Sequence, residues 1–138
     1  MHRTISFHIT YEEVRRFYAA GTGDLAGMEE IVAEDYFDHH FLPGMPKGPE
    51  GVRQWFSAVL GSVFSEMRVE IDRMVAEGDL VDCHFALLCK HTADFGDLKA
   101  KGNALRIPAI STFRIADGKL AEGWELYDSG DMARQMQA

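Results

Sequence analysis

The spacing of apolar residues changes near Met67, and this change limits the fold more than any other feature of the chain. Before Met67, apolar side chains recur about every 3.6 residues. After it they alternate with polar ones, as Met67, Val69 and Ile71 do. The first period is typical of helices and the second of strands with one buried face. The order of helices first and antiparallel strands afterwards predicts an α+β fold.

Three helices are expected in the first half of the chain. Thr10 and Glu13 fit a capping box at the start of the first helix. A second, short helix is expected to start at Asp24, and Pro49 is well placed as the first residue of the third. Residues 34–48 contain prolines and glycines, so this segment is predicted to be a loop.

The second half is expected to form an antiparallel sheet. Strands are predicted from Met67, over residues 80–92 and over residues 104–116, and Asp117-Gly118 is a hairpin signal that leads into a last strand. We expect the helices to pack on one face of this curved sheet and to leave a cavity between the two layers, where ligand sites are common. Residues 1–138 are therefore expected to form a single domain.

Composition excludes several classes of partner. The chain of 138 residues carries a formal charge of −8 without a basic cluster, which argues against nucleic acid and anionic membranes. No apolar run approaches the ~20 residues of a membrane span, and the first residues lack the apolar stretch of a signal peptide, so a cytoplasmic protein is expected. Cys83 and Cys89 are interpreted as core residues. The six histidines show no HxH or HxxxH spacing, so no metal site is expected.

The segment GKLAEGWELYDSGDM, residues 118–132, places an acid where an apolar face is expected. In a regular strand, Leu120, Trp124 and Asp128 would share one face. A carboxyl group against apolar walls has a raised pKa and can exchange protons near neutral pH. The alternative interpretation is that Asp128 caps a helix beginning near Ser129, or pairs with an arginine.

Four segments of the chain form a recognisable set: DYFDHH with GPEGV, VAEGDLV, CKHTADF and FRIADGKLAEGWELYDSGDMARQM. Together they resemble the SnoaL-like polyketide cyclases, a branch of the nuclear transport factor 2-like superfamily. The resemblance covers about residues 10–138 and implies a cone-shaped fold with a curved antiparallel sheet packed against three N-terminal helices. The chain departs from the family pattern at Lys90, Ala93 and Gly123, the last being a position where family members often have histidine.

The resemblance also implies site residues. In characterised cyclases of the family, the aspartate after the tryptophan is the acid/base of an intramolecular aldol closure that needs no metal or organic cofactor, which implies this role for Asp128. His91, with His39, would position or polarise the substrate carbonyl. A satisfied core histidine is the alternative for His91, and His40 is the weaker candidate of the histidine pair. Five aromatic residues are expected to line the cavity or simply to fill the core: Trp55, Phe56, Phe85, Phe113 and Trp124.

Two functions follow as hypotheses. The first is a cyclase or isomerase, without cofactor, acting on a bulky apolar carbonyl compound. The second is a non-catalytic domain of the same fold that binds a small molecule or dimerises. Another reaction of the superfamily, such as ketosteroid isomerisation or epoxide hydrolysis, would need a second acid or an Asp-Arg pair. A homodimer through the outer face of the sheet is expected, largely from the resemblance.

Overall fold

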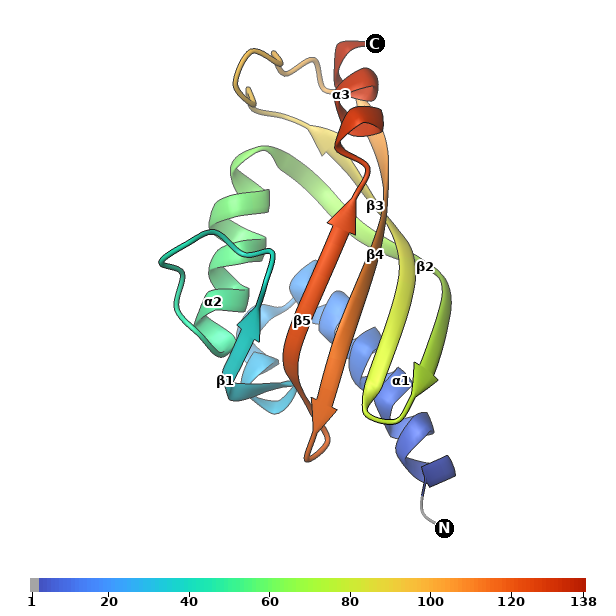
Figure 1. The fold of residues 1–138 in the computed structure, drawn as a ribbon. Helices are drawn as coiled ribbons and strands as arrows, with labels where there is room; N and C mark the ends of the chain where they lie inside the picture. Colours follow the sequence, from blue (N-terminus) through green and yellow to red (C-terminus); the bar gives the residue numbers. More distant parts are fainter. Residues whose placement is uncertain (1–2) are drawn as a thin grey trace.

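The protein folds as a layer of helices against one face of a five-stranded sheet (Figure 1). The computed structural model describes the backbone of residues 3–138 and the side chains from Tyr11 onward. The helical elements are α1 (Arg3–Gly21), η1 (Leu25–Glu30), α2 (Pro49–Gln54), its π-helical continuation η2 (Trp55–Val59), η3 (Leu60–Ser62) and α3 (Ser129–Gln137). The strands are β1 (Val32–Asp38), β2 (Phe64–Glu77), β3 (Leu80–His91), β4 (Ala104–Ala116) and β5 (Lys119–Tyr127).

The strands follow the order β1-β5-β4-β3-β2. Strands β2 to β5 pair antiparallel with their neighbours, whereas β1 pairs parallel with β5 at one edge. Figure 1 shows the long strands curving in front of α1, with α2 beside β1 and α3 at the end of β5. The predicted α+β class and the run of antiparallel strands are confirmed.

The turn between β4 and β5 has the geometry that its sequence predicts. Asp117 and Gly118 have φ angles of 53° and 75°, so both lie in the left-handed region that a type I′ hairpin turn requires. Pro49 begins the third helical segment, as expected, and Asp24 caps the second by accepting a hydrogen bond from the amide of Ala26. These local signals were sufficient because each depends on neighbouring residues alone.

Several boundaries differ from the expectation. Strand β2 begins at Phe64, three residues before the predicted start at Met67. Helix α1 begins at Arg3, ahead of the predicted start at Thr10; the side chain of Thr10 lies outside the described ones. Residues 32–38, placed partly in the second helix and partly in a loop by sequence, form strand β1. The apolar residues of this strand come in adjacent pairs separated by acidic ones, so it lacks the alternation that marks a strand in a sequence.

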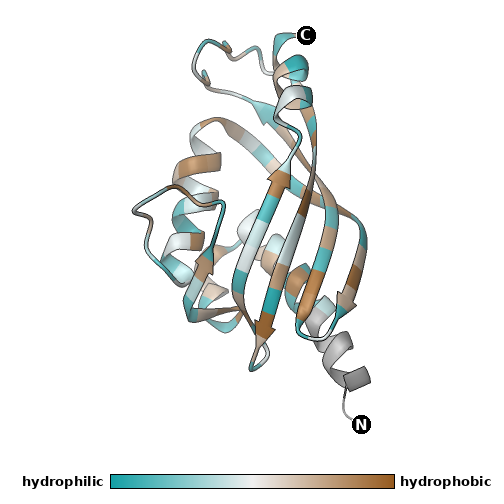
Figure 2. Cartoon of the chain, viewed as in Figure 1, coloured by the Kyte–Doolittle hydropathy of each residue, from teal (hydrophilic) through white to brown (hydrophobic). Residues whose placement is uncertain are grey.

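The core has two parts. The larger lies between α1 and the sheet, where the ring of Phe17 lies 5.2 Å from that of Phe113 and 5.7 Å from that of Phe56. The smaller lies beneath α3 and includes Met132 and Met136. Figure 2 shows hydrophobic and hydrophilic residues alternating along the long strands, as expected for a sheet with one covered face.

Both cysteines are buried on β3, as the sequence predicts. Burial raises the pKa of the Cys83 thiol to about 12 and that of Cys89 to about 11. The two thiols are therefore protonated at neutral pH. Among the helices of the described residues, none has the length and apolar character needed to span a bilayer.

A β-bulge interrupts the hairpin of β4 and β5. Residues 109–114 of β4 pair in one register, and the register shifts by one residue before Ile115, which pairs with Leu120 and leaves Ala121 as the additional residue. Such an insertion reverses the faces of all later side chains in the strand. The expected inner face of β5 is therefore wrong beyond Leu120: Leu126 is 81% exposed, while Glu125 turns inward.

Candidate functional site

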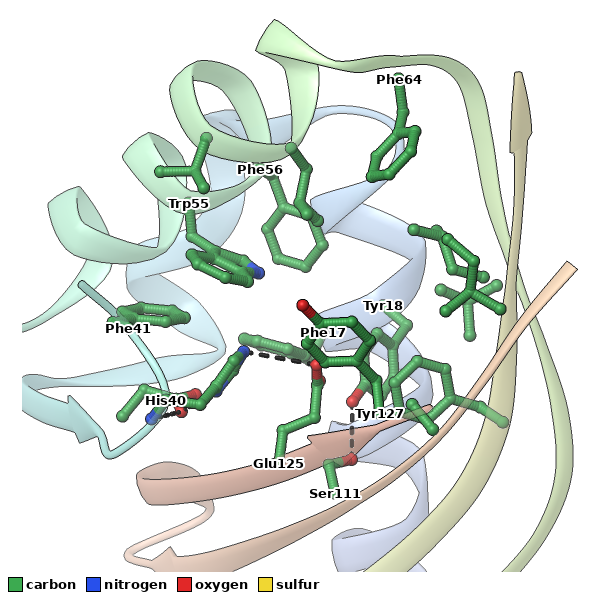
Figure 3. Close-up of a pocket in the computed structure, with 18 of the residues that line it drawn as sticks. Phe17, Tyr18, His40, Phe41, Trp55, Phe56, Phe64, Ser111, Glu125 and Tyr127 are labelled. Atoms are coloured by element: carbon green, nitrogen blue, oxygen red, sulfur yellow. Dashed lines mark hydrogen bonds and ion pairs between the residues drawn. The ribbon is translucent and has the colours of Figure 1, made fainter. Parts of the chain in front are cut away.

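A cavity of about 230 Å³ lies between the helices and the inner face of the sheet (Figure 3). Its wall is mostly apolar and is built from α1, the α2–η3 segment and strands β2 to β5. All five aromatic residues that the sequence suggests for the cavity lie in this wall: Trp55, Phe56, Phe85, Phe113 and Trp124. The cavity thus offers an apolar, aromatic surface to a ligand.

Polar side chains lie mainly along the side of the cavity formed by β1, β4 and β5. Asp38, His40, Ser111 and Glu125 line it there, and Tyr18 reaches the same region from α1. Figure 3 shows the carboxyl group of Glu125 directed toward the imidazole of His40, inside the ring of aromatic side chains. The site therefore combines an acid and an imidazole with apolar surroundings.

Burial has a large effect on Glu125. The side chain is 16% exposed, and loss of hydration raises its pKa from 4.5 to about 7; the nearby charge of His40 opposes this shift and that of Asp38 adds to it. A carboxyl group with this pKa is present in both protonation states at neutral pH. It can therefore act as an acid and as a base.

His40 lies between two carboxylates. Its Nδ1 donates a hydrogen bond to Oδ1 of Asp38, and its Nε2 lies 3.4 Å from Oε2 of Glu125. Burial disfavours the charged ring, but the hydrogen bond to Asp38 and the charges of Glu125 and Asp38 outweigh it, so the pKa of His40 is raised. The ring of Trp55 lies 4.6 Å away, edge to face, and limits its orientation.

Asp38 is itself held in place. The hydroxyl of Tyr36 donates a hydrogen bond of 2.5 Å to Oδ2, and Asp38 is 7% exposed. Burial, followed by the charge of Asp38, raises the pKa of Tyr36 well above its usual value, so the phenol keeps the proton that it donates. Tyr36, Asp38 and His40 thus form a chain of hydrogen bonds that ends beside Glu125.

Gly123 provides the space for this chain. A Cβ atom at position 123 would lie 2.2 Å from the Tyr36 hydroxyl and 2.7 Å from Oδ2 of Asp38. Both distances are far below van der Waals contact, and β1 pairs with β5 at this point through Asp38 and Gly123. The glycine that departs from the family pattern is therefore the residue that admits the Tyr36 and Asp38 side chains.

The family model for SnoaL-like polyketide cyclases matches residues 12–136. The chain belongs to this family. A search of curated proteins found no match to it.

Solved structures show the same fold. TsrD from Streptomyces laurentii is 22% identical, with a TM-score of 0.80 over 94% of this chain and 95% of that one. A proposed polyketide cyclase from Bacillus cereus ATCC 10987 is 26% identical, with a TM-score of 0.75 over 94% and 80% of the two chains. IdmH, a proposed polyketide cyclase from Streptomyces antibioticus, is 24% identical, with a TM-score of 0.76 over 94% and 99%.

Asp128, the acid that the family resemblance implies, lies outside the cavity wall. It is exposed and caps α3, with Oδ1 accepting a hydrogen bond of 2.9 Å from the amide of Asp131. This placement corresponds to the alternative interpretation of the sequence. The β-bulge at Ala121 is the physical reason, since it exchanges the faces of the strand and turns Glu125 inward instead.

His39 also lies away from the cavity lining. Its ring stacks on Trp124 with centroids 4.8 Å apart, and its Nε2 lies 2.6 Å from Glu122, which also contacts Arg114 at 3.0 Å. The side chain is 40% exposed. Neighbouring residues of an extended segment point to opposite sides, as the sequence indicates, but the inward one is His40.

His91 is completely buried at the end of β3, 6.5 Å from the ring of Phe64, and is separate from the residues that line the cavity. Both ring nitrogens are without a hydrogen-bond partner among the described residues. The structure thus brings the aromatic wall together but leaves Asp128, His39 and His91 outside it. Within the described part of the chain, no group of three or more His, Cys, Asp or Glu side chains is arranged to hold a metal ion.

The polar residues that sequence reasoning missed are Tyr36, Asp38 and Glu125, with His40 underestimated. The spacing of Tyr36, Asp38 and His40 is two residues, which would have placed all three on one face if the segment had been identified as a strand. Glu125 had no comparable signal, because its orientation depends on the bulge.

Replacing Gly123 with alanine is expected to lower the free energy of unfolding by about 1 to 3 kcal/mol, because the new methyl group overlaps Tyr36 and Asp38. Urea unfolding would measure this change. Gly27→Ala is the matched control, since a Cβ atom there meets nothing within 4 Å. Tyr36→Phe removes the overlapping oxygen and should reduce the cost of Gly123→Ala. Equal costs at positions 123 and 27 would contradict this role for Gly123.

The stability of the protein should fall as pH rises from 4.5 to about 7. In this interval the folded state holds a proton on Glu125 that the unfolded state has released, and the raised pKa of His40 acts in the same direction. Urea unfolding at about pH 5 and about pH 8 would measure this effect. Between these two pH values, the free energy of unfolding should fall by roughly 1 to 3 kcal/mol more in the wild type than in Glu125→Gln.

Glu122→Gln is the control for this measurement. Glu122 lies on the same strand, but the hydrogen bonds from His39 and Arg114 lower its pKa. The titration of Glu122 therefore affects stability at more acidic pH. The loss of stability above pH 5 should persist in the Glu122→Gln variant. A wild type and a Glu125→Gln variant with parallel pH profiles would show that Glu125 titrates normally.

Proposed function

We propose that the protein catalyses an acid/base ring closure of the intramolecular aldol type, or a related isomerisation, of an apolar carbonyl compound, with Glu125 as the acid/base. One observation carries the proposal: a carboxyl group with a pKa of about 7 faces an apolar cavity beside an imidazole oriented by a buried carboxylate. Membership of the SnoaL-like polyketide cyclase family supports this class of reaction.

In the proposed reaction, the ionised Glu125 accepts a proton from the carbon next to a substrate carbonyl, which leaves an enolate. The enolate carbon attacks a second carbonyl of the same molecule and forms a carbon–carbon bond. The electron pair of that carbonyl passes to its oxygen, which takes the proton back from Glu125. In an isomerisation, the carboxyl group would return the proton to a different carbon instead.

His40 would act as the positioning residue. Its Nε2 lies 3.4 Å from the Glu125 carboxyl, and its Nδ1 is bound to Asp38, so the ring is held with one nitrogen toward the acid. A protonated ring in this place stabilises the ionised form of Glu125 and so keeps the base available. Asp128 has a structural role in this proposal, as the cap of α3.

The size and chemistry of the cavity bear on the substrate. A volume of about 230 Å³ lies just below the ~300–1,000 Å³ typical of ligand pockets, which favours a compact molecule. The flat walls formed by Trp55 and Phe56 suit a fused-ring ketone. Holding one conformer with its reacting carbons together would supply much of the acceleration.

Proton exchange tests the proposal without the natural substrate. The bicyclic ketone 2-tetralone would be incubated with the protein in D₂O, and the loss of the hydrogens next to the carbonyl followed by proton NMR. Glu125→Gln should slow the protein-dependent exchange by about 10²- to 10⁴-fold. Asp128→Asn should retain it, because asparagine is also a good helix cap.

Saturation-transfer NMR on the same samples would measure binding separately. Loss of exchange in Asp128→Asn, with exchange retained in Glu125→Gln, would overturn the assignment of Glu125. Binding of 2-tetralone to the wild type without exchange would favour the alternative function, a domain that binds a small molecule without converting it.

We also propose that the protein forms a homodimer through the outer face of the sheet. Ile110 and Leu126 are cross-strand partners there and are 46% and 81% exposed, so the face presents apolar side chains that a second copy would cover. Leu126→Glu should therefore give monomers in sedimentation at micromolar concentration. Leu42→Glu, at a leucine that is 53% exposed before α2, is the control and should remain dimeric. A monomeric wild type would contradict the proposal.

A further inference from the structure

Two hydroxyl groups meet in the cavity wall beside Glu125. The hydroxyl of Tyr18, on α1, lies 2.6 Å from that of Ser111, on β4. Both residues line the cavity and are 4% and 1% exposed, respectively. Figure 3 shows this hydrogen bond directly beside the side chain of Glu125.

The hydroxyl pair has one proton more than its mutual hydrogen bond uses. Each hydroxyl carries one proton and can also accept, so one group donates to the other and the acceptor keeps a proton of its own. Among the described residues, neither hydroxyl makes a further hydrogen bond. A buried donor without an acceptor is costly, so this wall of the cavity favours a ligand atom that can accept a hydrogen bond.

The pair is well placed relative to the acid. Ser111 and Glu125 are direct partners in the pairing of β4 and β5, so their side chains lie on the same face, with Cβ atoms about 4.5–5.5 Å apart. Burial, followed by the charge of Glu125, raises the pKa of Tyr18 well above its usual value, so this phenol remains a donor. A base and a hydrogen-bond donor therefore face the same part of the cavity.

We propose that the Tyr18 and Ser111 hydroxyl pair binds the carbonyl oxygen of the substrate and stabilises the negative charge that develops there when Glu125 removes the neighbouring proton. This assignment rests on the proposed function. An enolate carries its charge largely on oxygen, and a donor already in place in a dry site stabilises that charge without reorganisation. The pair thus orients the substrate: oxygen toward Ser111, acidic carbon toward Glu125.

Enolate analogues provide the test. The ionised form of 2-naphthol resembles the enolate of 2-tetralone, and naphthalene has the same rings without the oxygen. The affinity of both would be measured by fluorescence titration in the Glu125→Gln background, at a pH where free 2-naphthol is ionised. Tyr18→Phe and Ser111→Ala should each weaken binding of 2-naphthol by about 10- to 100-fold and leave that of naphthalene within about twofold.

Tyr11→Phe is the matched control, because it removes another phenol hydroxyl from α1, at a residue outside the cavity lining, without changing the pair. It should alter neither affinity by more than about twofold. Equal effects of the Tyr18 and Ser111 variants on both ligands, or no effect on either, would overturn the proposal and leave the hydrogen bond as a link between α1 and β4. Ser111→Ala is decisive by itself if Tyr18→Phe does not fold.

The exchange assay separates this inference from the proposed function. If Glu125→Gln stops exchange while Tyr18→Phe and Ser111→Ala leave kcat unchanged, the inference fails and the proposed function stands. If both hydroxyl variants lower kcat by about 10²-fold or more with little change in KM, the pair acts on the developing charge, as proposed.

Discussion

The additional residue at Ala121 in β5 is the constraint on which the site depends. It turns the later side chains of the strand over, so that Glu125 enters the cavity and Leu126 faces outward. The acid then lies opposite Ser111, against apolar walls that withdraw it from water. Without the bulge, a different set of side chains from the same strand would face the helices, and the cavity would lack this carboxyl group.

The parallel strand β1 supplies the second half of the site. Tyr36 and Asp38 reach His40 from this strand, and they fit only because β5 has no side chain at Gly123. The hydrogen-bonded side chains of Tyr36, Asp38 and His40 are thus held in place by the backbone pairing of β1 with β5 and by close packing at Gly123. This arrangement fixes the imidazole before any ligand arrives, which is the property that an acid/base site requires.

The sequence predicted those features that depend on strong local patterns. Residues 104–116 alternate regularly and form a strand over those residues, and Asp117-Gly118 forms the expected turn. The aromatic residues suggested for the cavity lie in its wall, and for Phe85 and Phe113 the reason is that apolar parity identifies the inner face of a regular strand. The inward orientation of Glu125 was not predicted, since a bulge depends on how two strands pair, and β1 was missed because its apolar residues do not alternate.

The burial of both native thiols makes the protein a convenient host for chemical labelling. Cys83 and Cys89 lie in the core with pKa values of about 12 and 11, so reagents that attack thiolates will leave them intact in the folded state. A cysteine introduced at Phe95, which is 46% exposed in the cavity wall, would then be modified selectively. A fluorophore attached there would report directly on the entry of ligands, with no need to replace either native cysteine.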